Sequence, residues 1–348
     1  MNSDISNTSN RKKEHLELCS TDKVSFKTKT NGFENYEFKH YAITEVDLNK
    51  INFGCKFFGK KINYPFLISC MTGGTDKANN INEKLASVAE NLRIPIGVGS
   101  QRPALENEDF SNSFRIVRKN APDVPVLSNI GVAQIVQFNS IDSINKIIDM
   151  VEADALVIHT NPLQELLQDE GESDFKGLLK KIKMIINNLN IPVIVKEVGA
   201  GISYEVAKKL LDVGVKGIDV AGAGGTSWAG VEILRNKKDD DNHFWDWGLP
   251  TAFCIKDVFK LKKKFKFTLI GSGGISTGLE AAKALALGAD IIASARPVLM
   301  SLNEGGNKQV EAFIMNIFND IKRILFLTGS KNLKELRNKK LVKKKLLV

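Results

Sequence analysis

Short apolar runs rich in Val and Ile recur along most of the chain, and each is followed by a longer stretch of mixed apolar and polar positions. Two of the mixed stretches, residues 141–150 and 204–212, place apolar side chains at helical spacing. Nearly continuous apolar strands that alternate with helices are typical of parallel sheets covered on both faces, so the pattern predicts an α/β fold. The apolar runs occupy residues 64–70, 94–98, 124–128, 153–159, 191–196, 217–221, 267–271 and 290–294.

Eight such units fit a closed (β/α)8 barrel better than an open sheet, so we predict a TIM barrel with an N-terminal extension. A doubly wound sheet is the alternative, but no Gly-x-Gly-x-x-Gly motif follows the first strand. We expect residues 1–60 to form the extension, residues 61–330 the barrel and residues 331–348 a basic C-terminal tail.

The formal net charge of +9 is concentrated near the C-terminus. Residues 331–348 contain seven Lys and one Arg against one Glu, a formal charge of +7, and the remainder is close to neutral. A nucleic-acid partner is therefore not expected. We interpret the tail as a solvated basic helix end, with binding of RNA or acidic lipid as the alternative.

The chain carries no sign of a membrane span or a secretory signal. No apolar run approaches the ~18 residues that a span needs, and the first ten residues are polar. Four cysteines without metal-type spacing favour a reducing cytoplasm over a disulfide framework or a zinc site. We expect a cytoplasmic protein without a membrane partner; the cysteines are Cys19, Cys55, Cys70 and Cys254.

Chemistry is predicted where the apolar runs end, because the carboxyl ends of barrel strands form the active sites of TIM barrels. The fourth run ends in a group of polar side chains: His159, Asn161, Gln164 and Glu165. One carboxylate among amides, without thiols, favours Mg²⁺ shared with a diphosphate substrate. The alternative is that Glu165 belongs to the exposed face of a helix.

The later strand ends are rich in glycine, which lets backbone N–H groups approach a phosphate. Residues 222–227 and 271–274 supply this pattern, and Lys196 would place a cation in the middle of the barrel mouth. The set suits FMN, with its phosphate at the glycines and its ring near Lys196. Taken singly, the glycines could form turns, Lys196 could be a structural ion-pair partner and Met71 could be core packing.

The chain resembles the type 2 isopentenyl-diphosphate Δ-isomerases, which are FMN- and Mg²⁺-dependent (β/α)8 enzymes. The match extends from about Arg11 to Leu299. The motifs that carry it are Arg11-Lys12-x-Glu14-His15, Met71-Thr72-Gly73-Gly74, Gly99-Ser100-Gln101-Arg102, Ser128-Asn129-Ile130-Gly131, His159-x-Asn161-x-x-Gln164-Glu165, Lys196-Glu197-x-Gly199-x-Gly201, Gly224-Gly225-Thr226-Ser227, Asp246-Trp247-Gly248 and Ser272-Gly273-Gly274.

The resemblance implies a role for each matching position. Implied for substrate binding are Arg11, Lys12, Ser100, Gln101, Arg102, His159, Asn161 and Gln164, and Glu165 would bind Mg²⁺. Implied for FMN are Cys70, Met71, Thr72, Ser100, Asn129, Lys196 and Thr226, with Gly273, Gly274, Ala295 and Arg296 at its phosphate. Gln164 and Lys196 would assist catalysis. Three positions depart from the usual family pattern: Cys70 stands for Ala or Ser, Glu14 for Asp, and Ser276 for Arg.

The implied reaction converts isopentenyl diphosphate into dimethylallyl diphosphate, as part of isoprenoid biosynthesis. Reduced FMN would act as acid–base cofactor, NADPH would reduce it, and the protein would be a homotetramer or larger. The first alternative is an FMN barrel oxidoreductase that acts on a 2-hydroxy acid through a His–Arg pair. The second is a non-catalytic protein that binds flavin, or RNA through its tail.

Overall fold

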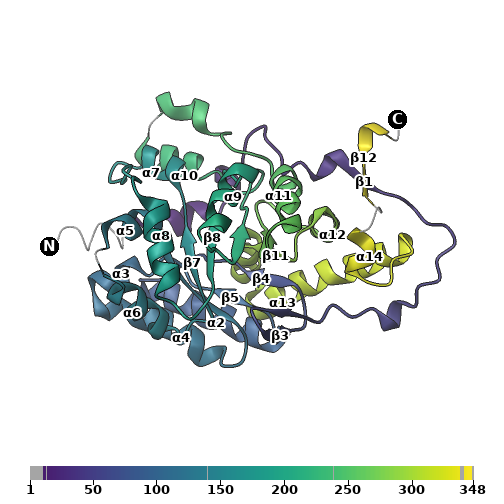
Figure 1. Ribbon diagram of the computed structural model, residues 1–348, viewed down its shortest axis with the longest axis horizontal. Coiled ribbons are helices and arrows are strands. Elements are labelled where there is room, and N and C mark those ends of the chain that lie inside the picture. The colour runs from purple at the N-terminus through teal and green to yellow at the C-terminus, as the bar shows by residue number, and fades with distance from the viewer. Residues whose placement is uncertain (1–10, 13, 139, 238, 338–340, 347–348) are drawn as a thin grey trace.

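The computed structural model describes residues 11–12, 14–138, 140–237, 239–337 and 341–346, and a closed barrel of parallel strands lies at its centre (Figure 1). Neighbouring strands follow one another in chain order, and the last pairs with the first. The eight apolar runs are confirmed as the eight barrel strands. They are β4 (Phe66–Ile68), β5 (Ile96–Gly97), β6 (Val126–Gly131), β7 (Ala155–His159), β8 (Val193–Lys196), β9 (Gly217–Asp219), β10 (Thr268–Gly271) and β11 (Ile291–Ser294).

Helices surround the barrel, and the two expected from helical spacing are confirmed as α6 and α9. The surrounding helices are α2 (Asp76–Leu92), α4 (Asn112–Asn120), α6 (Asp142–Met150), α8 (Leu178–Asn187), α9 (Tyr204–Asp212), α11 (Thr251–Phe259), α12 (Gly278–Leu287) and α13 (Arg296–Leu327). α12 begins with a capping box, because Thr277 accepts from the backbone N–H of Glu280 and Glu280 accepts from that of Thr277. α13 is kinked at Gly305 and Gly306, whose backbone angles are not helical.

Shorter helices follow several strands at the barrel mouth. They are α3 (Arg102–Glu106), α5 (Val132–Gln137), α7 (Pro162–Leu167) and α10 (Trp228–Asn236). Short 3-10 helices occupy several connections: η1 (Asp22–Val24), η2 (Phe33–Asn35), η3 (Leu48–Lys50), η4 (Glu108–Ser111), η5 (Asp239–Phe244), η6 (Lys260–Lys263) and η7 (Lys344–Leu346).

The opposite end of the barrel is closed by a hairpin of β2 (Cys55–Phe57) and β3 (Lys60–Ile62). Phe57 and Ile62 are buried against the apolar side chains that fill the barrel interior, among them Leu127 and Ile194. In Figure 1, β3 lies at the lower edge of the molecule and α7 and α10 at the upper edge. The hairpin of β2 and β3 and the mouth of the barrel therefore lie at opposite ends of the barrel.

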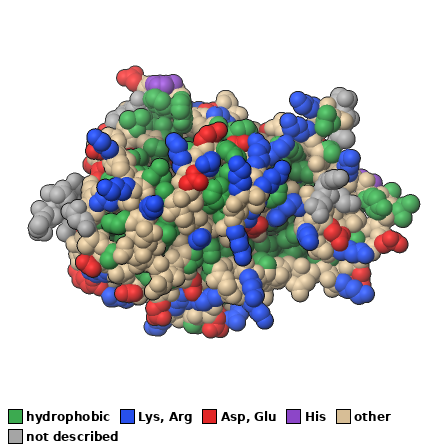
Figure 2. Space-filling view, viewed as in Figure 1, with side chains coloured by type: hydrophobic (Ala, Val, Ile, Leu, Met, Phe, Trp, Pro, Cys, Tyr) green, Lys and Arg blue, Asp and Glu red, His purple; other side chains and the backbone are tan. Residues whose placement is uncertain are grey.

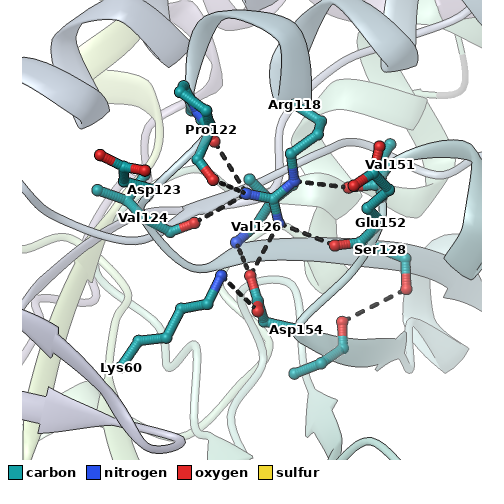
Figure 3. A network of polar contacts seen from close by, with 12 residues as sticks. Lys60, Arg118, Pro122, Asp123, Val124, Val126, Ser128, Val151, Glu152 and Asp154 are labelled. Carbon is teal, nitrogen blue, oxygen red and sulfur yellow. Dashed lines mark hydrogen bonds and ion pairs between the residues drawn. The ribbon is translucent and has the colours of Figure 1, made fainter.

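A polar network ties the hairpin to the barrel at this closed end (Figure 3). Asp154, just before β7, lies 2.7 Å from the Lys60 ammonium and 2.8 Å from the Arg118 guanidinium. Arg118 also donates to the carbonyls of Val151 and Glu152. It donates further to the carbonyls of Ala121, Pro122 and Val124. The side chain of Arg118 is only 12% exposed, so these acceptors replace most of its water.

The C-terminal residues pack against the molecule, whereas the sequence suggested a solvated helix end. In α14 (Leu333–Arg337), Leu336 is completely buried and Arg337 donates to the carbonyls of Leu285 and Ala289 at the end of α12. β12 (Leu341–Lys343) then pairs antiparallel with β1 (Tyr36–Phe38). The lysines of this segment give it its charge, but Leu336 and the strand pairing hold it in place.

The basic charge is not confined to the tail. Figure 2 shows Lys and Arg side chains gathered over the part of the surface where α9 and α11 lie. Lys209, Lys256 and Lys260 are exposed there. Partial desolvation of its ammonium group, followed by the charges of Lys343 and Lys260, lowers the pKa of Lys256, so the C-terminal strand adds to the same charged surface. Within the described residues, no helix is both long and apolar enough to cross a membrane.

Candidate active site

A cavity of about 360 Å³ opens at the carboxyl ends of the barrel strands. Its walls come from the ends of the barrel strands and from helical residues of the N-terminal extension, in the ranges 11–12 and 14–19. The structure brings together nearly all the residues that were predicted from the sequence to bind substrate, cofactor or metal. Those that line the cavity are Arg11, Lys12, Cys70, Met71, Thr72, Ser100, Arg102, Asn129, His159, Asn161, Gln164, Glu165, Lys196, Thr226, Gly273, Gly274, Ala295 and Arg296.

Gln101 is the exception, because its side chain points away from the cavity. It is completely buried, donates to the carbonyl of Ile147 at 2.9 Å and accepts from the backbone N–H of Asn129 at 3.0 Å. A side chain held in this way joins β6 to α6 and is not available to a ligand in the cavity. The structure therefore does not bear out the expectation that Gln101 binds substrate, because its side chain is engaged elsewhere.

The group of side chains after β7 is held by hydrogen bonds within α7 and the following loop. The Asn161 amide donates to Gln164 at 3.1 Å and to Glu165 at 2.9 Å, and the backbone N–H of Glu172 donates to the second Glu165 oxygen at 2.9 Å. Asn161 Oδ1 is buried without a hydrogen-bond partner among the described residues. An oriented carboxylate beside an unpaired amide oxygen suits a hydrated hard cation.

The described residues contain no group of three or more Cys, His, Asp or Glu that could enclose a metal ion by itself. Glu165 is therefore a single carboxylate donor. Mg²⁺ is commonly held by one or two carboxylates together with substrate phosphates and water, so this donor set fits Mg²⁺ that arrives with a diphosphate.

Glu232 is a site residue that sequence reasoning missed. It lies completely buried on α10, accepts from Gln164 at 2.9 Å and from Arg235 at 2.6 Å, and lies 2.9 Å from His15. Burial opposes its ionisation, but hydrogen bonds from His15 and Gln164 and the charge of Arg235 lower its pKa overall. The Gln164 amide is thus fixed on one side by Glu232 and on the other by Asn161.

Three cations gather on the same side of the cavity. Lys12 donates to the carbonyls of Gly73 at 2.6 Å and Ser100 at 2.9 Å, and Arg102 pairs with Glu106 at 2.6 Å. Burial and the neighbouring Arg11 lower the pKa of Lys12 to about 7. Burial and Arg102 likewise lower the pKa of Arg11. Like charges held this close together favour a polyanionic ligand.

His159 closes the β7 end of the cavity and is uncharged near neutral pH. Its Nδ1 lies 2.8 Å from the Asn129 amide oxygen and donates to it. Burial, followed by the charges of Lys196 and Lys12, lowers the pKa of His159 to about 3. Because Nδ1 carries the proton, Nε2 is left as a hydrogen-bond acceptor.

Lys196 ends β8 and lies in the cavity wall. Its ammonium donates to the carbonyl of Glu197 at 2.8 Å and lies 3.8 Å from the Asp219 carboxylate. Asp219 also accepts from the Ser272 hydroxyl at 2.5 Å, and burial raises its pKa, against the effects of Lys196 and Ser272. The Asp219 carboxylate is thus hydrogen-bonded and paired, and Lys196 both pairs with it and lines the cavity.

The glycine loop after β10 is built so that only glycine fits. A Cβ at Gly273 would lie 2.2 Å from the Gly222 carbonyl, and one at Gly274 would lie 2.3 Å from the Gly224 carbonyl. Both residues have positive φ angles, +107° and +71°. This loop, the end of β11 and the first turn of α13 form a backbone cradle of the kind that binds phosphate.

Cys70 contributes a neutral thiol to the wall. Burial raises its pKa to about 11. Its sulfur would lie 2.4 Å from a Cβ at Gly97, so the cysteine occupies the space left by the absent side chain.

Comparisons with known proteins show the family of the chain. The model of the FMN-dependent dehydrogenase family matches residues 6–111 and 123–343. Isopentenyl-diphosphate delta-isomerase of Nostoc sp. is 44% identical over 97% of this chain and 96% of its own. The proteins of that name from Pelodictyon phaeoclathratiforme and Cronobacter sakazakii are 41% and 42% identical, over 97% and 96% of this chain and 98% and 97% of their own.

Solved structures agree on the fold. A mutant of flavocytochrome b2 superposes with a TM-score of 0.71 at 19% identity, over 96% of this chain and 83% of that chain. A mandelate oxidase mutant superposes with a TM-score of 0.68 at 15% identity, over 98% of both chains. These structures share the barrel fold, and the family model places the chain among the FMN-dependent dehydrogenases. Within that class, the chain belongs to the isopentenyl-diphosphate delta-isomerase family.

Proposed function

We propose that this protein converts isopentenyl diphosphate into dimethylallyl diphosphate, with reduced FMN as acid–base cofactor and Mg²⁺ bound to the diphosphate. The observation that carries the proposal is the grouping of Arg11, Lys12 and Arg102 with the oriented carboxylate of Glu165 in one cavity. Cations and a metal ligand are what a diphosphate needs, whereas a small carboxylate substrate needs fewer charges.

The cavity offers groups that suit the cofactor at both ends. The Gly273–Gly274 cradle would hold the FMN phosphate, and Lys196 would lie by the ring, where its charge stabilises the reduced form. Thr72 and Asn129 would supply hydrogen bonds to the ring, and Ser100 and Thr226 would line it. We further propose that NADPH supplies the reducing equivalents.

The reaction adds a proton to the terminal alkene carbon and removes one from C2, with no net change in oxidation state. When bound, reduced FMN would supply a proton and facing negative charge. Glu232, ionised and buried, fixes the Gln164 amide so that it lines the substrate pocket in one orientation. The neutral His159 accepts through Nε2, which suits a protonated phosphate oxygen or a metal-bound water.

The decisive experiment incubates the reduced holoenzyme with isopentenyl diphosphate and Mg²⁺ in D₂O. We expect dimethylallyl diphosphate that carries deuterium from solvent. If neither product nor deuterium uptake appears, the proposal fails. A parallel assay with 2-hydroxy acids, with and without a metal chelator, tests the oxidoreductase alternative, for which the chelator should make no difference.

A single substitution tests the metal site. Glu165→Gln keeps the shape of the side chain but removes its charge, so we expect Mg²⁺-dependent turnover to fall by a factor of about 10² while the flavin absorption spectrum is unchanged. Unaltered turnover in this variant would remove Glu165 from the metal site.

A further inference from the structure

One segment of the N-terminal extension carries the substrate side of the cavity. We call residues 11–12 and 14–28 the strap. Its helical part contributes Arg11, Lys12, His15, Leu16 and Cys19 to the cavity wall. At this end the strap is fastened by the two hydrogen bonds from Lys12 to the carbonyls of Gly73 and Ser100.

Arg296 is one of the residues that fasten the other end of the strap. The guanidinium donates to the carbonyl of Thr21 at 3.1 Å and to the Ser25 hydroxyl at 2.8 Å, and lies 3.7 Å from the Asp22 carboxylate. The side chain of Arg296 is 17% exposed, whereas that of Asp22 is 82% exposed, so the two hydrogen bonds are better shielded from water than the ion pair. Backbone bonds add to the fastening at this end. The N–H of Ser227 donates to the carbonyl of Val24 at 2.8 Å, and the N–H of Phe26 donates to the carbonyl of Gly225 at 3.4 Å. The N–H groups of Lys27 and Thr28 donate to the Asp246 carboxylate.

Arg296 also belongs to the phosphate cradle. It begins α13 directly after Ala295, and the Ser294 hydroxyl donates to the carbonyl of Ile275, which joins this turn to the glycine loop. The described cationic side chains that line the cavity are Arg11, Lys12, Arg102, Lys196 and Arg296. Of these, Arg296 alone adjoins the cradle in sequence, and Ser276, in the loop itself, is uncharged.

We propose that Arg296 is a positioning residue that links the phosphate of the flavin to the substrate-binding strap. A guanidinium has five N–H donors, and the two bonds to the strap leave three for a phosphate. A phosphate in the cradle would fix the guanidinium in its present place and so hold Thr21 and Ser25. The strap would then present Arg11 and Lys12 to the diphosphate.

This linkage rests on the proposed FMN-dependent function and adds to it. Since coupling between two binding sites is reciprocal, FMN should tighten substrate binding and substrate should tighten FMN binding. Riboflavin has the same ring without the phosphate, so it should fill the cavity without ordering the strap. The strap carries its own reporters, because Lys23 and Lys27 are exposed trypsin sites.

The test is limited trypsin digestion of the apoprotein, alone and saturated with FMN or riboflavin, with flavin fluorescence to verify saturation. We expect FMN to slow cleavage at Lys23 and Lys27 by about tenfold relative to riboflavin. Ser25→Ala removes one acceptor of Arg296 and should reduce this difference severalfold, and Arg296→Met should abolish it. Thr28→Ala is the matched control: it loses a bond from the strap to Asp246 and should keep the full difference.

Equal protection by FMN and riboflavin in the unmodified protein would overturn the linkage, as would an undiminished difference in Arg296→Met. Failure to bind either flavin would overturn it together with the proposed function. The other outcomes distinguish the linkage from the proposed function, because limited digestion does not depend on turnover. Protection without isomerisation would contradict only the proposed function, and isomerisation without selective protection would contradict only the linkage.

Discussion

At the scale of single residues, the cavity contains two basic side chains whose charge is suppressed. Burial is the main cause for both, and it lowers the pKa of Lys12 to about 7 and that of His159 to about 3. His159 therefore stays neutral across the physiological range. Lys12, in contrast, gains or loses its proton close to neutral pH, so the charge on the substrate side of the cavity depends on pH.

Substrate affinity should therefore fall as the pH rises. Above about pH 7 the free protein loses the Lys12 proton, whereas a bound diphosphate would raise the pKa of Lys12 and keep the proton on. We expect the affinity for isopentenyl diphosphate, measured by calorimetry from pH 6 to 9, to fall by up to tenfold per pH unit above pH 7. Lys12→Arg keeps its charge throughout, so its profile should lack this decline.

Ionisation of the diphosphate itself affects both proteins equally and cancels in the comparison. Parallel profiles for the unmodified protein and Lys12→Arg would contradict the assignment of the titration to Lys12.

The residue scale also shows the limits of the sequence. Ser100 and Arg102 line the cavity, but Gln101 between them does not, because the backbone direction at a strand end decides which neighbours face inward. Glu232 had a signal that could have been used. It stands between Val231 and Ile233 in an apolar stretch of helix, and a carboxylate in such a place needs a buried partner. Which partner it has depends on the packing of α10 against α7.

At the scale of elements, the network around Arg118 and Asp154 fixes the connections at the closed end of the barrel. Side chains at this end contribute to the stability of the fold, because the chemistry of such barrels takes place at the other end. Arg118 joins residues on both sides of β6, and Asp154 joins β7 to the hairpin through Lys60.

Loss of Arg118 should destabilise the fold without touching the cavity. In Arg118→Met, Asp154 loses its guanidinium partner and five backbone carbonyls lose a donor, so the free energy of unfolding should fall by about 3–5 kcal/mol. Arg115→Met is the matched control on the same helix. Its side chain is 54% exposed and pairs with an exposed Glu108, so we expect at most about 1 kcal/mol.

Urea unfolding of both variants, saturated with FMN, gives the comparison. Similar urea midpoints for Arg118→Met and Arg115→Met would show that the polar network around Arg118 contributes little to the free energy of unfolding.

Local pattern was sufficient for the barrel but not for the elements that close it. The eight strands could be predicted because each is buried on both faces and so reads as an apolar run. The hairpin of β2 and β3 could not, since its residues mix Lys with Phe and Ile and only Phe57 and Ile62 reach the core. The pairing of β1 with β12 joins segments at opposite ends of the chain, and no local pattern encodes such a contact.

At the scale of the whole molecule, the C-terminal segment is part of the fold. Leu336 packs in the main hydrophobic core, and Arg337 donates to the carbonyls of Leu285, in the last turn of α12, and of Ala289, just beyond it. A truncation after Gly329 would therefore remove core contacts as well as charge. Loss of binding to RNA or lipid in such a truncation could not be attributed to the lysines alone.

Point substitutions separate the two effects. Leu336→Ala should lower the free energy of unfolding by about 2–5 kcal/mol, because it leaves a cavity in the core. Leu346→Ala, in a side chain that is 70% exposed, should change it by less than about 0.5 kcal/mol. Chemical denaturation followed by fluorescence measures both. If Leu336→Ala lowers the free energy of unfolding as little as Leu346→Ala does, the C-terminal segment does not unfold cooperatively with the barrel.

The pairing of β1 with β12 has a consequence for folding during synthesis. The paired residues lie more than 300 positions apart, so β1 emerges from the ribosome long before its partner has been translated. At ~5–20 residues per second, the interval is roughly 15–60 s. Throughout that time, β1 has an unpaired edge, because β12 has not yet been made. Final closure of the N-terminal segment must wait until residues 341–343 have left the ribosome, and until then the unpaired segment is exposed to chaperones and to other chains.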